Sequence, residues 1–366
     1  MPVSKKWLDD LPKEAGLFQD VSNIDRWAAS FPITLVFING HFAKNASDLK
    51  NVPKSVTLCT ITEALLIHED RIKLYLLKEP ELMTDGLFLD VPDEVTLDSP
   101  IHLLFIHTKQ NEFVTHPKNI LLAGKHSRFS LIEEHVSDQA DHYFTNVVTE
   151  IHANQNAKVD YYKIQNNALT ATHLAGIIIN QQKDSRVRAF SFSKGARLSR
   201  EDLAVFQREE AAETVLHGLY TPHQDDQHMD HHLQIDHLAA FGKSAMLYKG
   251  ILDKKSRAVF NGKVHVHANT KQINAHQANH NLLLSKDAEI NSKPELEIYA
   301  EDVKCTHGAT IGQLDSESLF YLRSRGILQD EAHAMLVRAF SSEVYDRIEH
   351  EKIRQHIRER MNDYDV

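Results

Sequence analysis

Residues 159–192 read VDYYKIQNNALTATHLAGIIINQQKDSRVRAFSF. Three short runs in this stretch, at 159–164, 175–179 and 187–192, are rich in β-branched and aromatic residues. Polar segments such as 181–184 separate them, and none of the runs shows an apolar period of helical length. This pattern predicts short β-strands joined by tight turns.

The same texture extends from about residue 100 to residue 312. Further β-rich runs lie at 101–105, 120–122, 129–133, 144–151, 214–220, 232–238, 245–251, 257–260, 264–267, 282–284 and 296–300. Long crossover helices are missing from this pattern, which excludes a doubly wound parallel sheet. From the pattern alone, a β-solenoid and a sandwich or jelly roll are equally favoured.

The segments that flank this region differ from it. Residues 1 to about 30 read as helical pieces, and the β-rich run at 33–42 contains Asn39-Gly40, a pair typical of a tight hairpin turn. After residue 312 the apolar period is helical, with Asp315 or Ser316 as a cap and Gly326 at the helix end.

The sequence therefore predicts three parts. They are an N-terminal helical cap with a small hairpin over 1–95, a β core over 96–312 and a C-terminal helical domain over 313–366. The second C-terminal helix carries an apolar stripe that includes Met335, Leu336, Phe340 and Val344. Such a stripe either packs on its own domain or docks a partner protein, and both interpretations stay open.

The composition is globular with an acidic balance. Apolar residues make up 42% of the 366, which is enough for a packed core, and the formal net charge is -10. This charge argues against nucleic acid or an anionic membrane as a partner, since both recruit Lys and Arg. The N-terminus has no apolar signal segment and no stretch suits a membrane span, so we expect a cytoplasmic protein.

Cysteine is scarce, because Cys59 and Cys305 are the only two in the sequence. Two distant cysteines suit a reducing compartment better than a disulfide framework. They also cannot supply the four thiolates that usually hold an iron-sulfur cluster. Any cluster would therefore have to be shared with another chain.

Signatures of common enzymes are missing. The sequence has no G-x-S-x-G nucleophile elbow and no G-x-G-x-x-G dinucleotide loop. Gly242-Lys243-Ser244 imitates the end of a phosphate loop, but position 237 is His, and residues 238–241 are too apolar and bulky to wrap phosphate oxygens. We therefore expect a non-enzymatic protein that binds no nucleotide itself.

His265-Val266-His267 supports a rival hypothesis, because it places two imidazoles on one face of a strand. The chain would then be a metal-dependent β-barrel enzyme of the cupin type that uses His265 and His267. Such sites follow the H-x-H pair with a carboxylate a few residues on. Residues 268–271 supply none.

The segment 293–308 brings a soft ligand beside an imidazole. If it stays extended, Leu296 points towards a core, whereas Cys305 and His307 share the opposite face with Glu297 and Glu301. Cys and His two residues apart can both reach one iron or zinc ion, and the two residue types occur together among iron-sulfur ligands.

Several segments resemble the SufB/SufD family of the Suf iron-sulfur cluster assembly system. They are VFINGHF at 36–42, LIEE at 131–134, AKVDYYKIQ at 157–165, EIYA at 297–300, VKCTHGAT at 303–310 and FYLRSRGI at 320–327, before a long amphipathic helix. The resemblance covers residues from about 32 to 345. The form Cys-Thr-His-Gly-Ala-Thr favours the SufD branch over the SufB branch.

The resemblance implies a right-handed parallel β-helix core flanked by N-terminal and C-terminal helical regions. It implies a paralogous partner, SufB, and an ATPase, SufC, docked near the C-terminal helices; a homodimer is the other assembly we consider. In this family the Cys-x-His segment lies where the two paralogues meet. His307, with Cys305 beside it, is therefore the expected ligand of a transient iron-sulfur cluster shared with SufB, on a scaffold subunit of the SufB-SufC-SufD complex.

Overall fold

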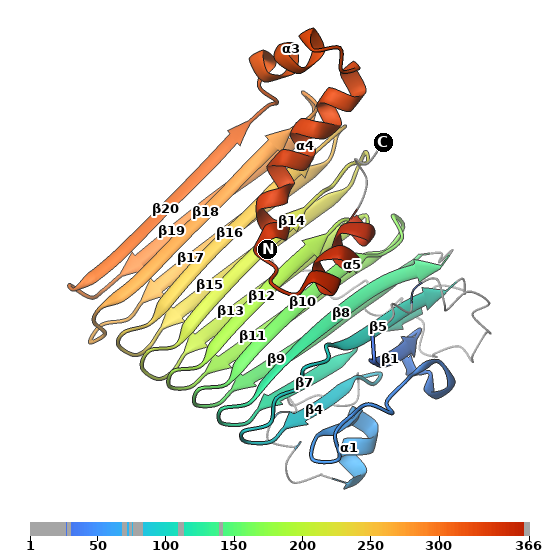
Figure 1. The fold of residues 1–366 in the computed structure, drawn as a ribbon, viewed down its shortest axis with the longest axis vertical. Helices are drawn as coiled ribbons and strands as arrows, with labels where there is room; N and C mark the ends of the chain where they lie inside the picture. Colours follow the sequence, from blue (N-terminus) through green and yellow to red (C-terminus); the bar gives the residue numbers. More distant parts are fainter. Residues whose placement is uncertain are drawn as a thin grey trace, which may run out of the picture.

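The computed structural model describes Trp27, residues 31–67, Ile72, Tyr75 and residues 83–108, 113–138 and 142–361. Most of these residues are in strands, which stack as the coils of a parallel β-solenoid (Figure 1). The mainly β class and the parallel β-helix core are therefore confirmed, and the sandwich alternative is excluded. The helical pieces expected before residue 30 lie outside the described residues, apart from Trp27.

Two long sheets form the solenoid. Sheet 1 contains β1 (Ile33–Ile38), β2 (His41–Phe42), β5 (Ile101–Thr108), β8 (Arg128–Asp138), β10 (Lys158–Asn166), β12 (Arg186–Ser193), β14 (Glu213–Tyr220), β16 (Lys243–Leu252), β18 (Ile273–Leu283) and β20 (Val303–Gly312). Sheet 2 contains β3 (Thr57–Thr60), β4 (Leu87–Val91), β6 (Phe113–Thr115), β7 (Lys118–Ala123), β9 (Tyr143–Ala153), β11 (Thr172–Gln181), β13 (Leu198–Gln207), β15 (His228–His237), β17 (Arg257–Val266) and β19 (Glu289–Ile298).

From β8 onwards, consecutive strands alternate between the two sheets. Each pairs in parallel with the strand one coil away, as β10 does with β8 and β12. Alternate side chains point into the solenoid, where Val159 and Tyr161 of β10 lie in the largest apolar cluster. Each coil therefore buries its inward side chains against its neighbours, and the core extends along the stack.

One corner of the solenoid repeats a left-handed backbone conformation. The residues in this conformation are not glycines, and their φ values lie between 56° and 65°: Glu94, His126, Asn156, Asp184, Ala211 and Phe241. Each donates its N–H to a carbonyl of the next coil, as Asn156 does to Lys183 at 3.0 Å and Ala211 to Ala240 at 3.0 Å. The corner thus continues the hydrogen-bonded stacking between coils.

The Asn39-Gly40 hairpin is confirmed. It joins β1 to β2 as an antiparallel pair, with φ of 50° at Asn39 and 84° at Gly40. β1 also pairs in parallel with β5, and β4 with β7, so strands before residue 96 belong to the solenoid sheets. A short 3-10 helix, η3 (Lys44–Ala46), and α1 (Ile61–Ile67) complete this region. The three-part division at 95 and 312 stays a prediction.

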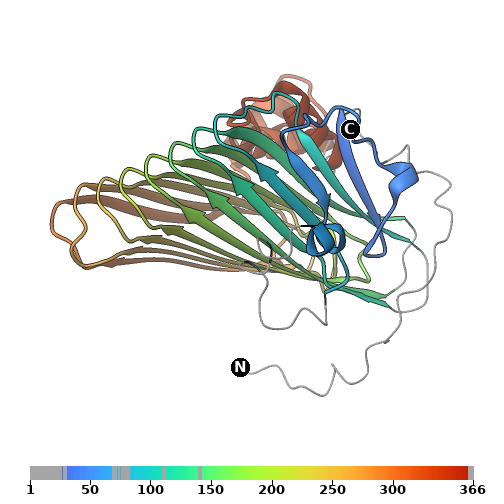
Figure 2. The same ribbon diagram turned by 90° about the horizontal axis from the view of Figure 1, so that it is seen from below.

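The C-terminal helical region is confirmed by α3 (Ser316–Ser324), α4 (Gln329–Asp346) and α5 (Glu351–Met361). Asp315 caps α3 by accepting a hydrogen bond from the Ser318 N–H at 2.9 Å, and Gly326 follows the helix with φ of 89°. α4 and α5 pack on the outside of sheet 1 (Figure 2), whereas α3 stands clear of the sheets (Figure 1). In the described part of the chain, no helix has the length and apolar character needed to cross a membrane.

Candidate functional site

Cys305 and His307 lie on β20, the last strand of sheet 1. β20 pairs with β18, which places Cys305 beside Ala275 and His307 beside Gln277. Ala275 and Gln277 are buried and point into the solenoid, so Cys305 and His307 share this inward orientation. Among the described residues no further strand follows β20 in the sheet, and His307 is exposed.

Cys305 packs on the end of the core. It is half-buried and joins Leu296, Ala300 and Val303 against the apolar cluster around Val264. This burial raises the pKa of the Cys305 thiol above its ordinary value. The free thiol is therefore protonated at neutral pH, and an incoming metal ion would have to displace the proton to bind sulfur.

The expected grouping of Cys305 and His307 with Glu297 and Glu301 is wrong. The turn after Ile298 carries the chain from sheet 2 to sheet 1, so one alternation does not run through the whole segment. Glu297 is instead paired with Lys263 at 2.8 Å on the other sheet. Cys305 and His307 therefore belong to no cluster of three metal-binding side chains among the described residues.

A second group of ligand atoms lies on the outer side of sheet 2. Asp236 of β15 is opposite His265 of β17, and His267 follows directly after β17. Asp236 Oδ1 is 3.0 Å from His265 Nδ1 and 2.8 Å from His267 Nε2. The centroids of the two imidazole rings are 3.8 Å apart.

This group corrects part of the rival hypothesis. The β-barrel is wrong, because the two sheets form an open-ended solenoid. The carboxylate missing from 268–271 is supplied by Asp236, one coil earlier. The H-x-H pattern predicts a carboxylate only at positions shortly after His267, so it misses Asp236. The register between coils is the signal that places Asp236 opposite His265.

A third group is fully buried between sheet 1 and α5. Glu134 accepts hydrogen bonds from His102 Nε2 at 2.9 Å and from His356 Nε2 at 2.7 Å, while Arg360 Nε donates to its other oxygen at 2.6 Å. Burial would raise the pKa of Glu134, but the hydrogen bonds from His102 and His356 outweigh it and hold that pKa far below its usual range. With both carboxylate oxygens occupied, this group anchors α5 to the sheet.

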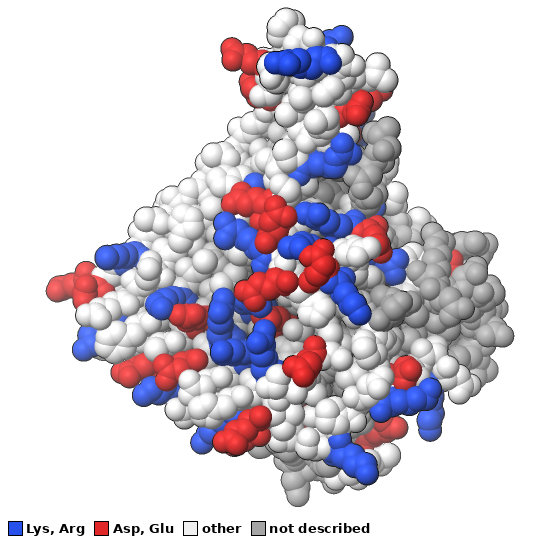
Figure 3. Space-filling view, viewed as in Figure 1, with Lys and Arg blue, Asp and Glu red and all other residues white. Residues whose placement is uncertain are grey.

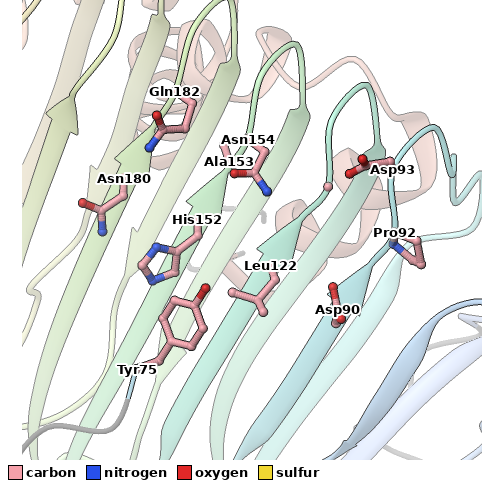
Figure 4. A pocket seen from close by; sticks show the side chains of 11 residues that line it. Tyr75, Asp90, Pro92, Asp93, Leu122, His152, Ala153, Asn154, Asn180 and Gln182 are labelled. Atoms are coloured by element: carbon pink, nitrogen blue, oxygen red, sulfur yellow. The ribbon is translucent and has the colours of Figure 1, made fainter. Parts of the chain in front are cut away.

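Two hollows lie on the outside of sheet 2. One, of about 380 Å³, is bordered by Asp90, Asp93, Asn180 and Gln182, and the rings of Tyr75 and His152 meet in it with centroids 4.6 Å apart (Figure 4). The other, of about 430 Å³, is a groove that crosses β11, β13, β15, β17 and β19 beside the Asp236 group.

The four apolar residues predicted to contact a partner differ in exposure. Val344 is fully buried against sheet 1, and Phe340 packs beside it with Lys249 Nζ 4.6 Å from its ring centroid. Met335 is exposed and Leu336 is half-buried. Half of the stripe therefore packs on its own domain, and a partner contact by these residues stays a prediction.

Sequence reasoning missed the apolar surface next to this stripe. No residue of α3 is buried, and Phe320 is 73% exposed. Leu328, at the start of α4, is 75% exposed. Such large exposed apolar side chains are typical of a surface that another protein covers.

Comparison with known proteins gives concordant matches. The profile described as "SUF system FeS cluster assembly, SufBD core domain" matches residues 105–340. An iron-sulfur cluster assembly SufBD family protein of Synechocystis is 35% identical over 334 residues, which cover 86% of this chain and 74% of the relative.

Two further relatives are each 32% identical to the chain. The alignment with the chloroplastic protein ABCI7 of Arabidopsis thaliana covers 75% of this chain and 59% of the relative. The alignment with the iron-sulfur cluster assembly protein SufD of Escherichia coli covers 66% of this chain and 57% of the relative. The chain therefore matches less than two thirds of the length of these two proteins.

Proposed function

The chain belongs to the SufBD family of iron-sulfur cluster assembly proteins, and from this premise we propose that it is a scaffold subunit of a complex with SufB and the ATPase SufC. Its contribution is to hold a transient cluster, or the iron that enters it, at the contact with SufB. SufC binds the nucleotide, and this chain alone makes no covalent bond.

The observation that carries this proposal is the incomplete ligand set at the end of the solenoid. Cys305 and His307 supply two donors, whereas iron-sulfur clusters usually have four protein ligands. No third donor joins them within the described chain. Because this coil is the last in its sheet, a second chain can approach and complete the set.

The surface around β20 suits a protein partner. Lys304 is the only charged residue in β20, and β18 beside it has none. The corresponding edge carries few blue or red side chains in Figure 3. An edge strand with unpaired backbone groups and few charges favours pairing with another chain. The same edge would also serve a homodimer.

We place the SufC contact at α3 and the start of α4. Phe320, Leu328, Met335 and Leu336 offer an apolar surface there, and Phe340 and Val344 support α4 from beneath. Phe340 and Val344 pack against sheet 1 and so stabilise the position of α4 on it. A cytoplasmic location is part of this proposal and can be checked by cell fractionation.

The experiment compares cluster assembly by the reconstituted complex with wild-type and variant chains. His307→Ala is expected to lower cluster formation at least about tenfold, and Cys305→Ser to have the smaller effect, because loss of metal-site groups has effects of this size. His276→Ala is the matched control, since His276 lies on the opposite face of the adjacent strand and hydrogen-bonds Thr306 at 2.8 Å. An unchanged rate for His307→Ala in an intact complex would refute the site.

A further inference from the structure

The Asp236, His265 and His267 side chains already have the spacing of metal ligands. Zinc and similar ions hold imidazole nitrogen and carboxylate oxygen at about 2.0–2.2 Å, which places neighbouring donors on one ion roughly 3 Å apart. The two distances from Asp236 Oδ1 are 3.0 Å and 2.8 Å. All three side chains offer donor atoms within 4.8 Å of one another.

The environment of Asp236 favours a cation. Its side chain is only 6% exposed, and within the described residues its ion-pair partners are the two imidazoles. Lys263 also attracts Asp236, but its own ion pair is with Glu297 at 2.8 Å. A buried carboxylate is unfavourable unless a positive charge compensates it. A bound divalent ion would supply that charge and displace the protons shared between the rings and the carboxylate.

A neighbouring side chain fixes the orientation of the carboxylate. Gln234 Nε2 donates to Asp236 Oδ2 at 2.6 Å, which leaves Oδ1 directed at the two imidazoles. Metal-binding carboxylates are commonly held in this way by an outer hydrogen bond. His267 is 36% exposed, so the remaining coordination positions can reach water. Gln234 also lines the groove of about 430 Å³ beside the site.

From these observations we infer that Asp236, His265 and His267 bind one divalent transition-metal ion on the outer face of sheet 2. Two imidazoles and one carboxylate with open positions are the ligand set of mononuclear Fe²⁺ sites and resemble that of several Zn²⁺ sites. The site contains no thiolate. It lies on a different sheet from Cys305 and His307 and uses none of the residues proposed for cluster assembly.

The test is metal binding by the full-length purified chain after treatment with a chelator. Calorimetric titration with Zn²⁺, and with Fe²⁺ under anaerobic conditions, is expected to give one ion per chain. His267→Gln should weaken binding by more than about 100-fold, and Gln234→Leu by about tenfold, because losing a ligand costs more than losing its outer hydrogen bond. Co²⁺ serves as a probe of ligand identity, since its visible absorption should change in His267→Gln.

His232→Ala is the matched control. His232 lies on the same face of sheet 2, is similarly exposed and pairs with Asp230 at 2.8 Å, but it has no second imidazole in its group. The affinity of the His232→Ala chain for Zn²⁺ should match that of the wild-type chain. Equal losses in His232→Ala and His267→Gln, or a wild-type stoichiometry well below one, would overturn the inference.

Two further measurements keep the result interpretable. Unfolding followed by circular dichroism shows whether each variant is folded, and a folded His267→Gln chain that still binds Zn²⁺ with wild-type affinity would overturn the site. The double variant with Cys305→Ser and His307→Ala should retain one ion on the outer site. Loss of that ion would assign it to β20, and would thereby refute this inference without contradicting the proposed function.

Discussion

Glu134 carries an unusual share of the contacts between the solenoid and its C-terminal helix. Three donors from β5 and α5 converge on its carboxylate, which has no exposed surface. In a buried group of this kind, removing one charge leaves its partners without compensation, and that loss outweighs the net contribution of the intact contact.

Glu134→Gln is therefore expected to lower the free energy of unfolding by about 3 kcal/mol. The amide keeps the shape of the side chain but cannot balance the Arg360 charge. Its NH₂ group is itself a donor, so it cannot accept the hydrogen bonds that one carboxylate oxygen accepts in the wild type. Urea unfolding followed by circular dichroism measures the change. Glu349→Gln is the control, because Glu349 pairs with Arg188 while 64% exposed and should cost less than about 1 kcal/mol.

The orientation of Cys305 shows where reasoning from single residues stops. The residue types alone indicated Cys305 and His307 only weakly, and the family resemblance was needed to select them. Their role as ligands stays a prediction. Their orientation was not predictable, since the turn between β19 and β20 interrupts the alternation of side chains. Asp236 was missed for a related reason: its partner His265 is adjacent only through the register of two coils.

At the scale of elements, local rules predicted well wherever a turn or cap is made by the residues themselves. The Asn39-Gly40 hairpin, the Asp315 cap and the Gly326 helix end all depend on neighbouring backbone groups. The solenoid corner is different, because the hydrogen bonds that stabilise its left-handed residues go to the next coil. None of the corner residues with positive φ is glycine, so the sequence contained no glycine pattern from which the corner could be predicted.

This corner offers a test by glycine substitution. Ala211 has φ of 59°, a conformation that strains any residue with a Cβ and suits glycine. Ala211→Gly is expected to raise the free energy of unfolding by about 0.5–1 kcal/mol. Thermal unfolding of the purified chain measures the sign.

Ala245→Gly provides the opposite case. Ala245 lies within β16, where it pairs with Val215 on one side and His276 on the other. Glycine in a regular strand should lower the free energy of unfolding by a similar amount, because it costs more backbone entropy on folding. If both substitutions destabilise the chain, strain at the corner is not the controlling effect.

At the scale of the whole molecule, the most distinctive property is the number of histidines enclosed by the solenoid and its helices. Burial lowers the pKa of His107 and His217 to about 3 and that of His231 and His237 to about 4. Each of these rings is therefore uncharged in the folded chain at neutral pH. In the unfolded chain they regain a pKa of about 6.5.

This difference makes the fold sensitive to acid. As the pH falls below about 6.5, the unfolded chain takes up protons that the folded chain does not bind, so the free energy of unfolding must decrease. Each ring contributes up to about 1.4 kcal/mol per pH unit, and the loss continues until the folded pKa values of about 3 to 4 are reached. Above about pH 7.5 these four residues make no contribution to the pH dependence of the free energy of unfolding.

Urea unfolding at a series of pH values from 7.5 to 5 tests this prediction, with His237→Gln as the informative variant. His237 hydrogen-bonds Ser244 at 2.9 Å, and glutamine can keep a hydrogen bond there without titrating. The variant's stability should fall with acid by up to about 1.4 kcal/mol per pH unit less than that of the wild type. A wild-type stability that rises on acidification would mean that the interior stabilises protonated rings, and it would contradict the enclosed, uncharged histidines on which this argument depends.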